Sequence, residues 1–265
     1  MDVLRKLVKQ LKSIGFGSLS TILFFIVWGL LSGAGVLNRG TIPDPLSVLR
    51  RLFENLFTTD LITTHMLPTV RRAALGFLLA AAMGLATGIL LVSLFRILRP
   101  LLVPAFRFFE KLNPLALFPV FMLFFGIGEL SKVLIIFWVV VWIVIFHTVE
   151  GIDNVESVHV ESAKSMGAGR FAMLSKVYLP AAAPQIFHGV KLGLSISFIF
   201  VISVEMLSAS SGLGWFIANA KHQYNLPNLY SSVLLVAVIG IFINTLVNYL
   251  ERRLFIWKQD PILPE

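Results

Sequence analysis

The sequence contains no cysteine and few charged residues. Asp, Glu, Lys and Arg make up 14% of its 265 residues, whereas a soluble domain carries about 25%. The absence of cysteine excludes disulfide bonds and thiolate metal sites. Hydrophobic residues reach 57%, and this excess argues against a soluble globular protein.

Several catalytic and nucleotide-binding motifs are also missing. No G-x-x-x-x-G-K-[ST] pattern occurs, so nothing in the chain would hold ATP phosphates. No G-x-S-x-G occurs, and the histidines are scattered without the spacing of metal ligands. These are His65, His147, His159, His188 and His222. An intramembrane enzyme is therefore a weak alternative, and no metal site is predicted.

Long apolar blocks are present instead. A helix needs about 20 mostly apolar residues to cross a bilayer, and lipid offers the backbone no hydrogen-bond partners. The sequence therefore predicts an all-α membrane protein with six transmembrane helices. An alternative lengthens the third helix by a preceding helix that carries Phe106 and Phe108. The six predicted spans are 19–37, 69–94, 112–127, 132–149, 184–207 and 231–250.

The distribution of Lys and Arg predicts the orientation. If both termini are cytoplasmic, 15 of the 22 basic residues fall on the cytoplasmic side, as the positive-inside rule requires. This N-in/C-in arrangement places residues 1–18 and 150–180 in the cytoplasm and 208–228 outside. The net charge of +8 then faces anionic lipid, so no nucleic-acid partner is needed to explain it.

A polar stretch, residues 150–180, interrupts the apolar blocks. It predicts two short helices, the first capped by Asp153 or Asn154. Gly167 and Gly169 permit a sharp turn between them, because glycine adopts positive φ without a steric penalty. Pro180 is expected to end the second helix.

The second helix of this stretch is amphipathic. Phe171, Leu174 and Tyr178 follow a helical spacing. An amphipathic helix at the membrane surface suits a groove on a soluble partner. The alternative is a solvated linker that only joins two spans.

The same stretch resembles the EAA loop of ABC importer permeases. That pattern is E-A-A, three residues, G, nine residues and I-x-L-P. Two positions differ conservatively, Ser162 for the second Ala and Val177 for Ile. The matching residues are Glu161, Ser162, Ala163, Gly167, Val177, Leu179 and Pro180.

The chain from Ile42 to Trp257 further resembles permeases of the aliphatic sulfonate, taurine and nitrate type. The similar blocks include "IPDPLSVLRRL", "PLALFPVFMLFFGIGELSK", "PAAAPQIFHGVKLGL" and "VEMLSASSGLGWFI". The resemblance implies a single permease domain over 1–265 with the type I ABC importer fold. It leaves the solute open among sulfonates, taurine, nitrate, bicarbonate and pyrimidine precursors.

The resemblance also implies partners. These are a second permease copy, two cytoplasmic ATPases that carry the ATP and Mg, and an extracytoplasmic solute-binding protein, in a bacterial inner membrane. The chain itself would hold no cofactor. The stretch 150–180 would couple to the ATPases through Glu161, Ser162, Ala163, Met166, Gly167, Phe171, Leu174, Tyr178, Leu179 and Pro180.

Small residues recur every four positions on two predicted spans. Such stripes let helix backbones approach closely in lipid. They predict helix packing, within one chain or across a homodimer, and a sliding surface during gating is the alternative. The two stripes are Gly76, Ala80, Gly84 and Gly88, and Gly189, Gly193 and Ser197.

Polar residues inside spans are candidates for the translocation path or its gate, because they are costly in lipid. For Glu205, a gate or a helix–helix hydrogen bond is favoured over contact with the solute. At His147 the family usually has Asn, with Pro where Ile143 stands, and a structural histidine is favoured over a path residue. Met206 and Ser203 flank Glu205 and complete the candidates.

Three further expectations concern the outer surface and the alternative function. Residues 38–67 and 208–228 are candidate contacts for the binding protein. Arg71 and Arg72, at the outer end of the second span, hint at an anionic solute. A secondary transporter or channel that works without an ATPase remains the alternative, although its expected internal repeats and charge relay are missing.

Overall fold

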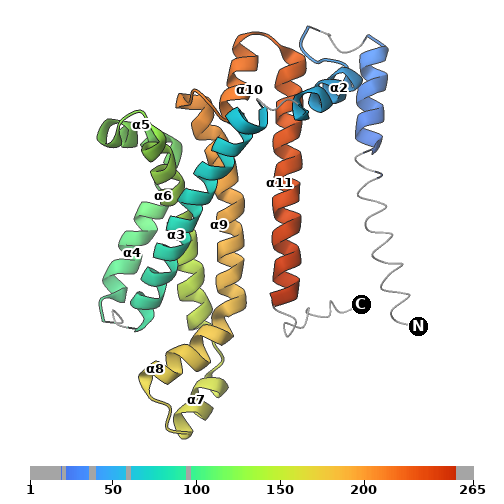
Figure 1. The fold of residues 1–265 in the computed structure, drawn as a ribbon. Coiled ribbons are helices and arrows are strands. Elements are labelled where there is room, and N and C mark those ends of the chain that lie inside the picture. The colour runs from blue at the N-terminus through green and yellow to red at the C-terminus, as the bar shows by residue number, and fades with distance from the viewer. Residues whose placement is uncertain (1–18, 20–21, 36–39, 58–60, 94–96, 255–265) are drawn as a thin grey trace, which may run out of the picture. The chain divides into compact units, whose positions relative to one another are not determined.

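The computed structural model describes residues 19, 22–35, 40–57, 61–93 and 97–254, and these residues form helices and turns without any strand (Figure 1). The chain divides into two compact units. The smaller comprises Met1–Leu61 and Phe216–Val236, and the larger comprises Ile62–Trp215 and Ala237–Glu265. Two helices, α10 (Leu213–His222) and α11 (Leu226–Leu254), each begin in one unit and end in the other.

The smaller unit joins segments that are far apart in the sequence. Val48 and Leu52 bury one side of a helix that begins at a proline, a residue favoured in the first helical turn. Arg51 of this helix donates from Nε to Oδ1 of Asn228 at 2.5 Å. Besides most of α10 and the first turns of α11, the described helices of this unit are Ile22–Gly33 and α2 (Pro45–Leu56).

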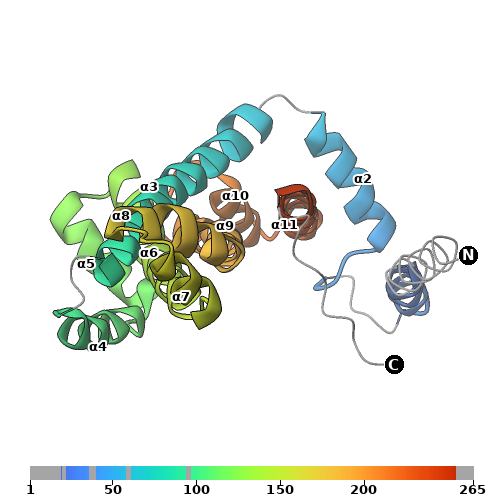
Figure 2. The same cartoon turned by 90° about the horizontal axis from the view of Figure 1, so that it is seen from below.

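Three long helices form the core of the larger unit. The middle one packs against both others (Figures 1 and 2). Its Ile135, Ile136, Val140 and Val144 have no exposed surface. The three are α3 (Leu67–Ser93), extended at its start by the π-helix η1 (Leu61–Met66), α6 (Glu129–Asp153) and α9 (Leu179–Ser208).

Glycines allow α3 and α9 to approach α6 closely. A Cβ placed on Gly84 would lie 2.8 Å from Cβ of Val144, and one on Gly193 would lie 2.8 Å from Cγ1 of Val140. Both distances are shorter than any ordinary carbon–carbon contact. The stripe on α3 therefore faces α6 within the chain. Its members, all buried, are Gly76, Ala80, Gly84 and Gly88.

Among the described residues, four helical runs are long and apolar enough to cross a membrane. They correspond to the predicted second, fourth, fifth and sixth spans. Of the predicted first span, 19–37, the structure describes an apolar helix, Ile22–Gly33, while residues 20–21 and 36–37 lie outside the described residues. The four runs are Leu61–Ser93, Glu129–Asp153, Arg170–Ser208 and Leu226–Leu254.

The predicted third span, 112–127, contains one helix of 12 residues. Its lengthening into one continuous helix by the preceding helix that carries Phe106 and Phe108 is wrong. Two helices, α4 (Arg99–Glu110) and α5 (Pro114–Phe125), meet at a bend of 94°. The Asn113 side chain accepts a hydrogen bond from the Leu115 backbone N–H at 3.0 Å, and Pro114 occupies the first turn. Asn followed by Pro starts a new helix here, because the asparagine caps it and proline has no N–H to leave unpaired.

Two predictions about the ends of the polar stretch are also wrong. Pro180 does not end a helix, since the helical run continues from Arg170 to Ser208. Pro180 follows a π-helical turn, η2 (Leu174–Tyr178), whose wider register moves the carbonyl that a proline ring would otherwise strike. Neither Asp153 nor Asn154 caps the next helix. α6 continues through Asp153 and has Asn154 as its C-cap, Glu156 precedes α7, and the Asp153 carboxylate pairs with Arg99.

Candidate functional site

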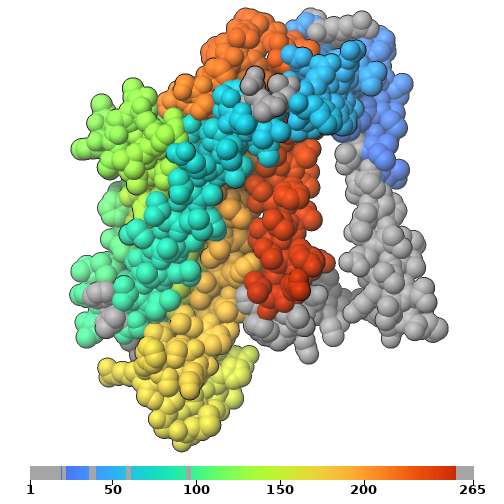
Figure 3. Space-filling model, in the orientation of Figure 1, coloured from blue at the N-terminus to red at the C-terminus, as the bar shows by residue number. Residues whose placement is uncertain are grey.

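The polar stretch 150–180, called the coupling loop below, projects from one end of the larger unit (Figures 1 and 3). Gly167 has φ of +76°, in the left-handed region that favours glycine, whereas Gly169 has φ of −71°. The Ala168 N–H reaches the Ala163 carbonyl at 3.0 Å, and the Gly167 N–H reaches that of Lys164 at 2.9 Å. This pair of bonds is a Schellman motif, which ends α7 (Ser157–Ser165) and sets the direction of α8 (Arg170–Met173).

Large apolar side chains remain exposed on both sides of this turn. Val158 is 65% exposed, Met166 80% and Phe171 82%. Of the other predicted coupling residues, Ala163 is buried, while Glu161, Ser162 and Pro180 are exposed and Leu174, Tyr178 and Leu179 lie between these extremes. The exposed apolar surface is therefore concentrated around the turn rather than along the whole second helix.

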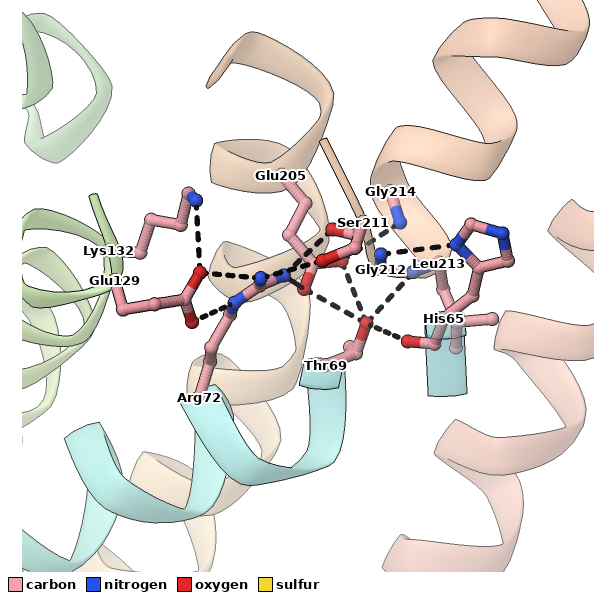
Figure 4. A network of polar contacts seen from close by, with 10 residues as sticks. All are labelled: His65, Thr69, Arg72, Glu129, Lys132, Glu205, Ser211, Gly212, Leu213 and Gly214. Atoms are coloured by element: carbon pink, nitrogen blue, oxygen red, sulfur yellow. Dashed lines mark hydrogen bonds and ion pairs between the residues drawn. The ribbon is translucent and has the colours of Figure 1, made fainter. Parts of the chain in front are cut away.

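A cluster of polar groups occupies the opposite end of the same unit (Figure 4). At its centre Glu205, near the end of α9, is 1% exposed. Its carboxylate accepts from Nη1 of Arg72 at 2.6 Å, from the Gly214 backbone N–H at 3.0 Å and from Oγ1 of Thr69 at 2.8 Å. A buried carboxylate needs such partners, because burial without them costs several kcal/mol, as a rough estimate.

Arg72 links this carboxylate to a second one. Its Nε and Nη2 each lie 2.7 Å from an oxygen of Glu129, at the start of α6. Lys132 adds a contact to Glu129 at 3.3 Å. The two cations and two carboxylates balance, so the cluster is neutral. We call it the polar cluster; its side chains are those of His65, Thr69, Arg72, Glu129, Lys132, Glu205 and Ser211.

This arrangement changes the interpretation of the arginine pair. Arg72 is 3% exposed in its side chain and directs its donors to carboxylates and to Ser211, so it is not available to an anionic solute. Arg71, its neighbour, is exposed. Glu205 was predicted from the sequence, but its partners were not. The available signal was limited to the position of Arg72 and Glu205 at the outer ends of two predicted spans, where a charged group needs a partner.

The other path candidates lie elsewhere on α6 and α9. His147 is hydrogen-bonded through Nδ1 to the Ile143 carbonyl at 2.9 Å and faces Gly189. The Ser203 hydroxyl donates to the Ile199 carbonyl at 3.1 Å. Met206 is 42% exposed. Within the described residues, no group of three His, Asp or Glu side chains is placed to hold a metal ion.

One candidate outer surface lies on α2 in the smaller unit. Leu46, Phe53 and Phe57 are exposed there. Hydrogen bonds from Arg51 and Arg50 hold the pKa of the Glu54 carboxyl below its usual range. This side chain therefore remains charged, and α2 presents exposed apolar and charged groups. Residues 38–39 and 58–60 of the predicted contact segment lie outside the described residues.

Comparison with known families decides the identity of the chain. Residues 76–256 match the model of the "binding-protein-dependent transport system inner membrane component". The chain belongs to this family. The matched segment includes the coupling loop, most of α3 and all of α6, α9 and α11. The predicted resemblance to ABC importer permeases is confirmed.

Individual relatives of this permease cover nearly its whole length. It is 31% identical over 244 residues to a putative aliphatic sulfonates transport permease protein, SsuC, of Bacillus subtilis, covering 92% of this chain and 88% of the relative. It is 27% identical to the taurine transport system permease protein TauC of Escherichia coli, covering 94% and 90%. It is 29% identical to the bicarbonate transport system permease protein CmpB of Synechococcus elongatus, covering 86% and 85%.

Solved structures support the same fold. One chain of a bacterial ABC transporter involved in alginate import superposes with a TM-score of 0.64 at 14% identity, covering 95% of this permease and 99% of that chain. A chain of the MetNI methionine ABC transporter in an inward-facing conformation gives 0.64 at 16% identity, covering 71% and 94%. The permease is thus a multi-pass helical membrane component of a transporter.

Proposed function

We propose that this permease is the membrane subunit of an ATP-driven importer that receives a small, anionic solute from an extracytoplasmic binding protein. The family match and the projecting coupling loop carry this proposal. The anionic class of solute is supported by relatives named for sulfonate, taurine and bicarbonate transport. The whole chain, 1–265, acts as one permease domain.

The coupling loop is the contact for the ATPase. ATP and Mg are held by that separate subunit, because this sequence has no phosphate-binding loop. Val158, Met166 and Phe171 form an apolar surface that a groove on the ATPase would cover, and Glu161 beside them offers a carboxylate to a basic group. Movement of the ATPases then tilts α6 and α9, which begin or end at this loop.

The proposed topology has six spans with both termini in the cytoplasm. Residues 1–18 and the coupling loop lie inside, and residues 208–228 lie outside with the polar cluster. Two permease copies pair with two ATPases, since each copy has one coupling loop. The complex lies in the bacterial inner membrane.

Within the path, Glu205 serves as a helix–helix contact and not as a solute ligand, because Arg72 already neutralises it. His147 is a structural residue between α6 and α9. Met206 and Ser203 remain candidates for lining the path. Groups other than Arg72 therefore balance the negative charge of the solute.

The deciding experiment is purification of the complex with its binding protein and ATPase. Mass spectrometry of the retained ligand should identify a small anion, and vesicles should accumulate that anion only with ATP and the binding protein. Uptake that proceeds without any ATPase would instead establish the secondary transporter or channel. Retention of a ligand that has no anionic group would refute the proposed solute class alone.

A further inference from the structure

Residues 209–214, which join α9 to the first turn of α10, are attached to the larger unit through their own backbone (Figure 4). Three successive N–H groups reach side chains from other elements. That of Gly212 donates to Nδ1 of His65 at 3.3 Å, and that of Leu213 to Oγ1 of Thr69 at 2.9 Å. That of Gly214 donates to Glu205 at 3.0 Å. A surface loop normally leaves such groups to water, so this segment, which we call the α9–α10 loop, has a fixed position.

Arg72 donates hydrogen bonds to acceptors in the same loop. Its Nη1 donates to the Ser211 carbonyl at 2.8 Å, and its Nη2 to the Ser211 hydroxyl at 3.0 Å. The same two nitrogens bond Glu205 and Glu129. A guanidinium carries five N–H donors in a planar fork. One side chain on α3 therefore bonds the start of α6, the end of α9 and the loop.

The loop also lies directly on the Glu205 carboxylate. Gly212 has φ of +114°, and a Cβ added there would overlap the carboxylate atoms of Glu205. A Cβ on Gly214 would likewise overlap the Ile202 carbonyl. Only glycine fits at these two positions, since any other side chain would lift the loop off α9.

We propose that Arg72 is a positioning residue for transport: it fixes the α9–α10 loop to the ends of α3, α6 and α9, so that the loop moves with these helices as one body. This inference rests on the proposed function, under which the loop is extracytoplasmic and can meet the binding protein. The buried ion pair of Arg72 and Glu205 suits this role, because breaking it leaves an unpaired buried charge.

The two ends of the unit are joined by continuous helices. α6 runs from Glu129 in the polar cluster to Asp153 at the coupling loop, about 37 Å at 1.5 Å per residue. A second helical run returns from Arg170 to Ser208, beyond Glu205. Displacement of the coupling loop is therefore transmitted to the α9–α10 loop through these two helical runs. Arg72 bonds both of them at the end opposite the coupling loop.

The first test measures amide hydrogen exchange of the full chain in lipid nanodiscs. In Arg72→Gln, exchange of the peptide containing residues 210–215 should rise about tenfold or more, because the loop loses the bonds from Arg72 to Ser211 and Glu205 loses the guanidinium that holds it in place. Arg71→Gln removes the same charge from the adjacent, exposed position and should leave that peptide unchanged. Equal exchange in Arg72→Gln and the parent would overturn the proposal, whatever solute the protein carries.

A second variant covers the case in which Arg72→Gln does not fold. Gly212→Ala keeps every charge and should raise exchange of the same peptide at least severalfold, because its methyl group displaces the loop from Glu205. Protection of α6 should stay at the parental level. Parental exchange in the loop of a folded Gly212→Ala protein would also overturn the proposal.

The second test examines transmission in the complete complex. An environment-sensitive dye on Ser210→Cys, in a chain without other cysteines, should respond when a non-hydrolysable ATP analogue binds the ATPases. Arg71→Gln should keep this response and Arg72→Gln should lose it while still binding the ATPases. A normal response in Arg72→Gln would overturn the transmission role. Failure of the parent to bind any ATPase would refute the proposed function instead, and the exchange measurement would still decide the loop attachment.

Discussion

Gly189 on α9 lies directly against the Cβ and ring of His147 on α6, so that a methyl group on Gly189 would overlap the histidine. The His147 Nδ1 contacts the Ile143 carbonyl at 2.9 Å, and because a carbonyl only accepts, Nδ1 carries the proton. The imidazole thus fills the space between two helices that must stay in contact. This position explains a histidine inside a span without assigning it to the solute.

The first prediction follows from this contact. Gly189→Ala should destabilise the folded protein by about 1–3 kcal/mol, because α6 and α9 must separate to admit the methyl group. Thermal unfolding of the protein in detergent should show a lower midpoint. The matched control is Gly240→Ala on α11, where the nearest atom to a new Cβ is 4.0 Å away. A midpoint for Gly189→Ala at or above that of Gly240→Ala would contradict the contact.

The second prediction concerns the pair formed by Arg99 and Asp153, whose Nη1 and Oδ1 atoms lie 2.8 Å apart. Their side chains are 29% and 39% exposed, so solvent screens the interaction. A double-mutant cycle with alanine should give a coupling energy of about 0.5–1 kcal/mol. The pair of Lys111 and Glu110 is longer, at 3.7 Å, and its lysine is 77% exposed, so it should give a smaller value. Coupling above about 3 kcal/mol would require a buried pair.

Much of the fold was predictable because lipid restricts the secondary structures that a membrane-spanning chain can form. Apolar runs of span length predicted four helical runs that the structure contains, and the small-residue stripes lie where α3 and α9 pack on α6. The break at Asn113 and Pro114 was missed, although an N-cap residue followed by proline is a local signal. The continuous helix through Pro180 was not predictable, since it depends on a π-helical turn that no periodicity reveals.

The polar cluster shows a different limit. Glu205 was identified because a carboxylate inside a span is costly. Its partner Arg72 is 133 residues away in the chain, and no spacing rule connects such positions. The backbone contribution of Gly212 and Gly214 was hidden as well, because a glycine in the sequence does not show which atoms its backbone will approach. Pairing of this kind is decided by how the helices pack.

The third prediction tests the proposed topology. Cysteine introduced at the exposed Ser210 should react with an impermeant thiol reagent added outside intact cells, whereas cysteine at the exposed Ser165 should react only after the membrane is opened. The native chain has no cysteine to give background. Labelling in the reverse order would overturn the N-in arrangement and move the coupling loop outside.

The fourth prediction compares two neighbouring glycines of the coupling loop. Neither Gly167 nor Gly169 has any atom within 4 Å of a new Cβ, but only Gly167 has positive φ. Gly167→Val should therefore cost about 1–2 kcal/mol in the turn and redirect α8 with the exposed Phe171, whereas Gly169→Val should leave the turn intact. At matched expression, Gly167→Val should insert normally yet lose the ATPase in a pull-down and lose ATP-driven uptake in vesicles, and Gly169→Val should retain both. If Gly167→Val binds the ATPase and transports like its neighbour, the direction of this turn is irrelevant to coupling, and residues 150–180 are only a linker.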